Sequence, residues 1–167
     1  MTSWFRLVLF GTALMTISSN LDALEVVQSQ GQAEILVDDI GWRRAVIGRT
    51  ISDDTVLSTW LSSNIIAEGD GLQIRMQPLS IATISQVSPS VAINLRAGAL
   101  RIMVESGNEF PVTVRVDGFT IRSSAAEFEL TRRSVSVVEG SVEVVDGADR
   151  NFTVEAPDQY SFVLHAP

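Results

Sequence analysis

The chain has 167 residues, a formal net charge of −8 and no cysteine. Its 12 basic residues are all arginine, so it contains no lysine, and its single histidine is His165. These counts exclude disulfide bonds, thiolate metal sites, cysteine nucleophiles and lysine-based catalysis. The acidic balance also argues against a broad contact with nucleic acid or with anionic lipid.

Residues 1–23 have the layout of a secretory signal peptide. Arg6 gives a weakly positive start, residues 7–17 are apolar or small, and Leu21-Asp22-Ala23 ends on a small residue. The apolar run is well short of the roughly 20 residues that a membrane-spanning helix needs. We therefore expect cleavage after Ala23, a periplasmic or secreted product made of residues 24–167, and no stable membrane span after cleavage.

From residue 24 onward, apolar side chains recur at every second position in short runs, as half-buried strands require. Turn dipeptides such as Asp70-Gly71 and Asp117-Gly118 separate these runs. The pattern predicts one all-β domain of about 12–14 short strands. The clearest runs are Leu72/Ile74/Met76, Val91/Ile93/Leu95, Leu100/Ile102/Val104, Val112/Val114/Val116, Phe128/Leu130, Val135/Val137 and Val142/Val144.

Two segments share the pattern apolar-x-x-Gly-x-apolar-x-apolar, namely 95–102 around Gly98 and 137–144 around Gly140. Each is typical of a strand, a glycine corner and a second strand, because glycine accepts a positive φ and lets two backbones approach closely. The repeated corner favours a sheet that turns several times. We expect a β-solenoid-like roll or a sandwich.

Taken in chain order, several segments resemble the FecR domain, the periplasmic module of iron-siderophore signalling proteins. Their order and spacing carry the resemblance, which covers nearly all of the chain after the signal peptide. Asp53 and Asp158 stand where the family has glycine. The segments are Gly31–Val37, Trp42–Gly48, Asp53–Thr59, Asp70–Met76, Pro78–Ser80, Leu95–Ile102, Val135–Val144 and Pro157–Gln159.

The resemblance implies a non-enzymatic binding or scaffolding module of the bacterial envelope, linked to iron-siderophore-type signalling. Full-length family regulators also carry a segment that binds a sigma factor and a membrane span, and neither is found in this sequence. We therefore expect a stand-alone exported form at residues 24–167. Its partner would be another envelope protein, contacted through loops or a free sheet edge.

No residue set in the sequence predicts catalysis or a cofactor. The pairs Asp38-Asp39 and Asp53-Asp54 are expected in turns or at solvated edges, because neighbouring residues on a strand face opposite sides. A Ca²⁺ site at these pairs stays open, as does a distant alternative of a hydrolase acting through Asp53 or Asp54. His165 lies near the end of the chain, outside any catalytic motif.

The candidate partner-binding residues are Trp60, Arg132 and Arg133, since tryptophan and arginine are enriched at interfaces. We expect Arg132 and Arg133 in a hairpin loop. Packing in the core or at corners is the favoured interpretation for Trp42 and Trp60. The alternative is a sugar-stacking surface, and with it the alternative function of an envelope carbohydrate-binding or structural β-protein.

Overall fold

The computed structural model of the protein describes residues 24–37, 40–87, 90–108 and 111–162. Within these ranges the chain forms 15 strands and no helix, which confirms the all-β expectation. The strand number is slightly higher than the sequence predicts. One strand, β3 (Gly41–Arg44), is too short and too exposed to show an alternating pattern, whereas β15 (Gln159–Ser161) lies where Tyr160 and Phe162 alternate with polar residues.

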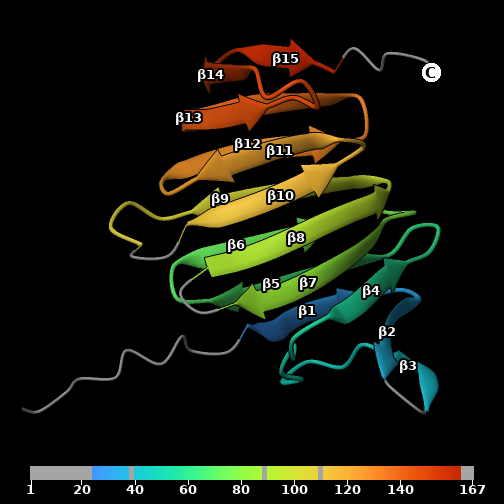
Figure 1. Ribbon diagram of the computed structural model, residues 1–167. Helices are drawn as coiled ribbons and strands as arrows, with labels where there is room; N and C mark the ends of the chain where they lie inside the picture. Colours follow the sequence, from blue (N-terminus) through green and yellow to red (C-terminus); the bar gives the residue numbers. More distant parts are fainter. Residues whose placement is uncertain (1–23, 38–39, 88–89, 109–110, 163–167) are drawn as a thin grey trace, which may run out of the picture.

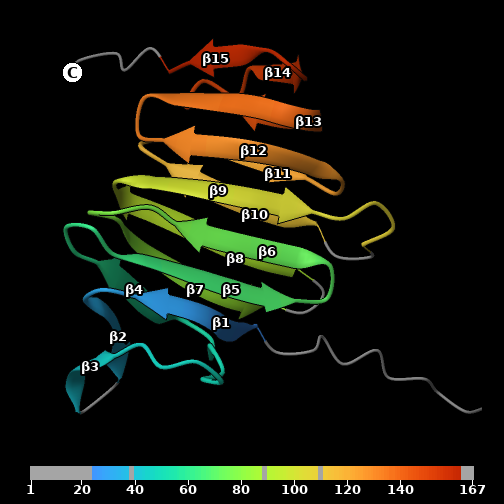
Figure 2. The same ribbon diagram turned by 180° about the vertical axis from the view of Figure 1, so that it is seen from behind.

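The strands make one continuous hydrogen-bonded sheet, which is folded into two facing layers (Figure 1). The back layer is seen from its outer side in Figure 2. In order, it contains β1 (Glu25–Gln30), β5 (Asn64–Gly69), β6 (Leu72–Met76), β9 (Ala99–Val104), β12 (Ala126–Thr131), the first half of β13 (Ser134–Val145), and β15.

The front layer faces the viewer in Figure 1 and begins at the edge strand β3. The order continues with β2 (Ala33–Val37), β4 (Thr55–Thr59), β7 (Ile81–Val87), β8 (Ser90–Ala97), β10 (Val112–Val116), β11 (Phe119–Ser123), the second half of β13, and β14 (Asn151–Glu155).

The chain passes repeatedly from one layer to the other as it rises from β1–β3 to β14–β15 (Figures 1 and 2). β8 and β10 pair in parallel because β9, in the back layer, lies between them in sequence. β13 belongs to both layers, since its first half pairs with β12 and its second half with β11. The architecture is therefore a two-layered sandwich whose chain winds as in a roll. It combines the two expected architectures, a solenoid-like roll and a sandwich.

The core fills the space between the layers and follows the alternation in the sequence. Leu72, Ile74 and Met76 on β6 are buried, as are Val112, Val114 and Val116 on β10. Intervening residues such as Arg75 and Arg115 are exposed on the outer faces. Burial of these side chains supplies the main stabilising free energy of the fold.

The glycine corner predicted at Gly98 is confirmed, whereas at Gly140 the structure has one continuous strand, β13, where two strands were expected. Gly98 joins β8 of the front layer to β9 of the back layer with φ +81°. Gly140, with φ +76°, lies at the point where β13 passes between layers, and a Cβ there would come within 2.6 Å of the Ala125 carbonyl oxygen. Only glycine fits such positions without strain.

The two ends of the stack of strands are closed differently. At the β14–β15 end, Phe162 stacks on Phe119 with ring centroids 4.5 Å apart, and Tyr160 lies beside Phe162. At the β1–β3 end, residues 45–51 cross from β3 to the edge of β1, and the Val26 N–H donates to the Arg49 carbonyl. The edge of β1 is thus covered. β3 remains the terminal strand of the front layer.

Candidate functional site

Trp60 is the first residue after β4, and its side chain is 50% exposed. Its backbone N–H donates to the Gln32 carbonyl at 3.0 Å, which fixes the corner. Its indole N–H donates to a carboxylate oxygen of Glu34 on β2 at 3.0 Å. The indole therefore lies on the outer side of the front layer with its polar group satisfied and its apolar ring facing solvent.

Trp42 lies on the same outer side. It is the cross-strand partner of Leu36 on β2, and Leu36 also faces Val56 on β4. Ile35, between Glu34 and Leu36, points into the core, so Glu34 and Leu36 both point outward. Leu36, Trp42 and Trp60 together form a surface that we call the tryptophan face.

Of the expectation that Trp42 and Trp60 pack in the core or at corners, the core is wrong for both, and only the corner position of Trp60 is found. Trp42 is 44% exposed, and Trp60 occupies a corner without being buried in it. β3 is an edge strand, and no described segment forms a layer over its outer side, so an outward-pointing side chain there stays exposed. The sequence pattern did not distinguish these tryptophans from core residues, because burial depends on which strand ends the sheet.

Further apolar side chains are exposed at the β1–β3 end of the sandwich. Ile40 precedes β3, while Val46 and Ile47 lie on the segment that closes this end of the sandwich, and Ile47 is 67% exposed. Leu79 lies beside Trp60, since its N–H approaches the Trp60 carbonyl at 3.4 Å. Such a gathering of exposed large apolar residues is typical of a contact surface. The consecutive Ala45-Val46-Ile47 breaks the period of two and is the sequence signal that could have indicated it.

Arg43 and Arg44 add positive charge at the free edge of β3. Both side chains are exposed, and within the part of the chain that the structure describes neither has an ion pair or a side-chain hydrogen bond. Arg44 faces Glu34 across the ladder, but the Glu34 carboxylate is held by the Trp60 indole. Several arginines elsewhere on the protein do form ion pairs.

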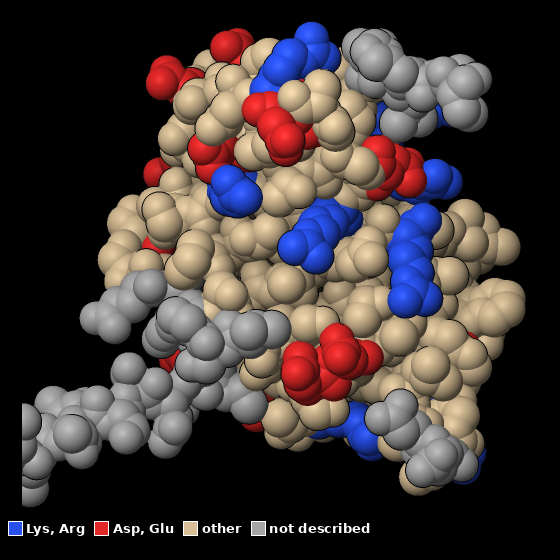
Figure 3. All heavy atoms as spheres, in the orientation of Figure 1, with Lys and Arg blue, Asp and Glu red and all other residues tan. Residues whose placement is uncertain are grey.

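The ion pairs among the described residues lie on the strands and turns from β9 to β14. Arg101 contacts Glu127 at 2.7 Å and Glu129 at 3.1 Å. The hydrogen bond to Glu127 raises the pKa of Arg101, so this guanidinium is firmly charged. Figure 3 shows arginine and acidic side chains intermingled over the upper strands. The remaining pairs are Arg122–Glu143, Arg132–Asp117 and Arg150–Asp146.

Arg132 and Arg133 form the turn between β12 and β13, as the sequence predicts. The Arg132 guanidinium makes two hydrogen bonds to the Asp117 carboxylate, at 2.8 and 2.9 Å, and these raise the pKa of Arg132. Its charge is therefore used within the protein. Between β4, which precedes Trp60, and β10, which precedes Asp117, lie β7 and β8. At about 4.8 Å per strand, β4 and β10 are some 14 Å apart across the sheet, and the structure does not join Trp60 and the arginine turn into one site.

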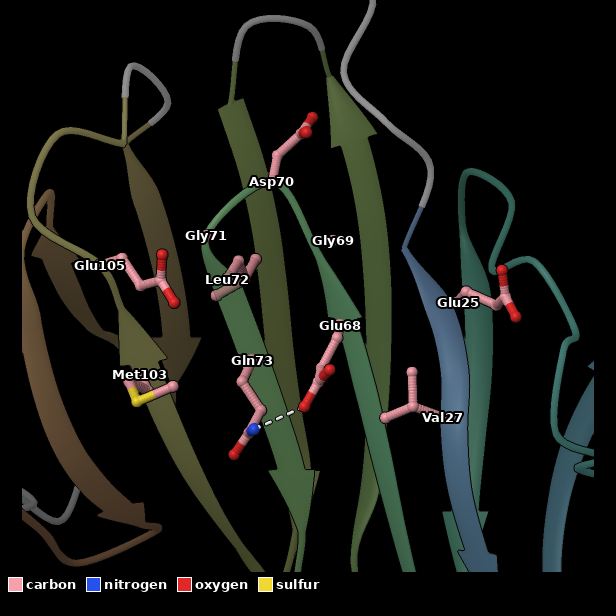
Figure 4. A pocket seen from close by; sticks show the side chains of 10 residues that line it. All are labelled: Glu25, Val27, Glu68, Gly69, Asp70, Gly71, Leu72, Gln73, Met103 and Glu105. Atoms are coloured by element: carbon pink, nitrogen blue, oxygen red, sulfur yellow. Dashed lines mark hydrogen bonds between the residues drawn. The ribbon is translucent and has the colours of Figure 1, made fainter.

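A cleft with a volume of about 450 Å³ lies on the outer side of the back layer, beside the β5–β6 turn (Figure 4). Glu25, Glu68, Asp70 and Glu105 line it. The Glu68 carboxylate accepts a hydrogen bond from the Gln73 amide at 2.6 Å. In Figure 4 the carboxylates point in different directions from separate strands. No group of three or more acidic or histidine side chains within the described ranges could hold a metal ion.

Asp53 and Asp54 have structural roles. An oxygen of Asp53 accepts the N–H of Gln86 at 2.9 Å and that of Asp54 at 3.1 Å, and the Asp54 carboxylate accepts the Ser85 hydroxyl. These bonds hold the turn before β4 against β7. Asp38, Asp39 and His165 lie outside the described residues.

No family model, curated protein or solved structure matches this chain. In the described ranges, no helix is long and apolar enough to cross a membrane.

Proposed function

We propose that the chain is an exported, non-enzymatic module, similar to the FecR domain, that binds another protein of the bacterial envelope. The contact surface is the tryptophan face together with the adjoining edge of β3. The observation that carries this proposal is the exposure of Trp42 and Trp60 on one side of the same three strands. Two large apolar rings beside arginines that have no ion pair among the described residues are typical of a protein-binding surface.

The rest of the described surface supports a role in contact rather than in catalysis. The cleft beside the β5–β6 turn is open and its carboxylates diverge, while Asp53 and Asp54 are engaged in holding a turn. The likeness to the FecR domain rests on the order and spacing of the sequence segments alone. A link to iron-siderophore-type signalling is part of the proposal.

The test is capture of a partner from envelope extract by the tagged chain, followed by mass spectrometry. We expect one protein to be enriched by the wild type and lost with Trp42→Ala or Trp60→Ala. Val138→Ser is the matched control, because Val138 is also an exposed apolar residue, at 46%, but lies on β13. Equal capture by all variants would contradict the proposed surface.

A second outcome of the same experiment tests the alternative function. Exposed tryptophan rings also stack on sugars. If purified peptidoglycan sediments the wild type but not Trp42→Ala, and no protein is captured, the surface binds carbohydrate and the protein-binding proposal is wrong.

A further inference from the structure

We infer that the free edge of β3 binds an extended acidic segment of the partner as an added strand. The inference rests on the proposed function and names the chemistry of the partner. Three features of β3 carry the inference: its open backbone groups, the charges of Arg43 and Arg44, and the apolar ring of Trp42.

The register of the β2–β3 ladder determines which backbone groups of β3 are open. The Ala45 N–H donates to the Ala33 carbonyl at 2.8 Å, so residues 33 and 45 form a hydrogen-bonded pair. Such pairs alternate along an antiparallel ladder. The next ones are therefore Ile35 with Arg43 and Val37 with Gly41. Trp42 and Arg44 consequently direct their N–H and C=O groups away from β2.

The edge of β1, unlike that of β3, is covered by another segment of the chain. β1 also ends a layer, but the segment 48–51 covers it: the Gly48 N–H donates to the Val26 carbonyl at 2.9 Å and the Ile51 N–H to the Leu24 carbonyl at 2.7 Å. The same crossing segment leaves β3 at Ala45 and adds no strand beyond it. An open edge at which two residues direct their backbone N–H and C=O groups away from the sheet is a template for an added strand.

The charges decide between possible occupants. If a second copy added its own β3, four arginines would lie within two neighbouring strands, and like charges on paired strands are destabilising. Arg43 and Arg44 thus act against self-pairing of this edge. An added strand with acidic side chains opposite them would make two ion pairs that the described chain itself does not supply.

The side of the sheet to which each β3 side chain points determines which residues we expect in the added strand of the partner. Trp42 and Arg44 point to the outer side of the front layer, and Arg43 points to the other side. The added strand would place an apolar side chain opposite Trp42 and acidic side chains opposite Arg43 and Arg44. The sequence Val-Glu-Glu-Val satisfies this pattern in either strand direction.

The test uses the full chain and two synthetic fluorescent peptides, Ser-Thr-Val-Glu-Glu-Val-Thr-Ser and the same peptide with lysine in place of both glutamates. We expect the wild type to bind the glutamate peptide about tenfold more tightly than the lysine peptide, from the sum of the two cross-strand charge pairs. Arg43→Glu/Arg44→Glu should reverse this preference. Failure of the wild type to bind the glutamate peptide, or equal affinity for both peptides, would overturn the inference.

Backbone recognition needs its own readout. Arg44→Ala removes only the charge, whereas Arg44→Pro also removes the outward N–H without breaking the ladder to β2. We expect Arg44→Pro to bind the glutamate peptide more weakly than Arg44→Ala, with unchanged thermal unfolding. Hydrogen exchange should slow at the Trp42 and Arg44 amides of the wild type when the peptide is added. Exchange that slows only elsewhere would overturn strand addition.

The outcomes separate the inference from the proposed function. If partner capture depends on Trp42 while the glutamate peptide fails to bind, the contact surface is correct and strand addition is wrong. If capture shows no dependence on Trp42 or Trp60, the proposed function itself fails.

Discussion

Ser80 lies directly against Gly98, and a Cβ on Gly98 would come within 2.2 Å of the Ser80 hydroxyl oxygen and 2.5 Å of the Ser80 Cα. The Ser80 side chain is fully buried, and it exchanges two hydrogen bonds of 2.9 Å with the backbone of Ala99. This contact joins the start of β7 to the corner between β8 and β9.

We therefore expect Gly98→Ala to lower the free energy of unfolding by about 3 kcal/mol, because both the positive φ and the close approach to backbone atoms oppose a side chain. Gly118→Ala is the control. Gly118 has φ +85° but no atom within 4 Å of an added Cβ, so its cost should be only about 1–2 kcal/mol. Equal losses in denaturant titrations would contradict the close approach at Gly98.

The carboxylate of Asp146 should make stability depend on pH. It accepts the backbone N–H groups of Arg150 at 3.0 Å and Ala148 at 2.9 Å, and it is paired with the Arg150 guanidinium. The hydrogen bond from the Arg150 backbone is the main cause that lowers the pKa of Asp146. A lowered folded-state pKa means that the stabilisation is present above the unfolded pKa of about 4 and is lost as pH falls through the folded-state pKa.

The measurement is the free energy of unfolding of the wild type and of Asp146→Asn between pH 7 and pH 2. The difference should be constant near neutrality and shrink below about pH 4. Asp149→Asn, in the same turn, is the control, because the Asp149 side chain has no hydrogen bond or ion pair within the described residues. A difference that does not vary with pH would contradict this role of Asp146.

The aromatic contact of Phe162 closes the β14–β15 end of the core, and its side chain is buried against Phe119. Phe162→Ala should cost about 3–4 kcal/mol, the usual range for removing a buried phenylalanine. Phe152→Ala, at a partly exposed ring that stacks on Tyr160, should cost about 1–2 kcal/mol. Thermal and denaturant unfolding of both variants provides the comparison.

Arg132 should not take part in partner binding, because Asp117 already holds its guanidinium through two hydrogen bonds. Arg132→Ala is expected to capture the envelope partner as well as the wild type does, whereas Arg44→Ala captures less. Quantitative mass spectrometry of the captured protein measures both. A loss with Arg132→Ala equal to that with Arg44→Ala would place the contact surface at the β12–β13 turn instead.

Export is tested by the N-terminus of the protein recovered from the periplasm or the medium. We expect the sequence to begin at Leu24, and we expect Ala23→Arg to prevent this processing because signal peptidases require a small residue at the cleavage site. A recovered wild-type protein that still begins at Met1 would contradict the signal peptide.

Local patterns predicted the strands well because each depends on neighbouring residues. The pair Asp117-Gly118 predicts a two-residue hairpin, and the structure has φ of 44° and 85° there, with Val116 facing Phe119. Gly98 and Gly140 predict corners for the same reason: a positive φ is a property of one residue.

The candidate site depended on relationships that no local pattern contains. Trp42 carries a large apolar ring of the kind that usually packs in a core. It is exposed because β3 lies at the end of the front layer. The hydrogen bonds from Arg132 to Asp117 join two turns that are 15 positions apart in sequence. Sheet order and long-range pairing had to be known before either residue could be assigned a role.

The passage of β13 between layers has a consequence for how the protein unfolds. Its first half is held by β12 and β15, and its second half by β11 and β14. Neither layer can separate from the other while this strand remains paired. Native-state opening should therefore involve both layers as one cooperative unit, with the slowest amide exchange on both halves of β13 and earlier exchange at β3.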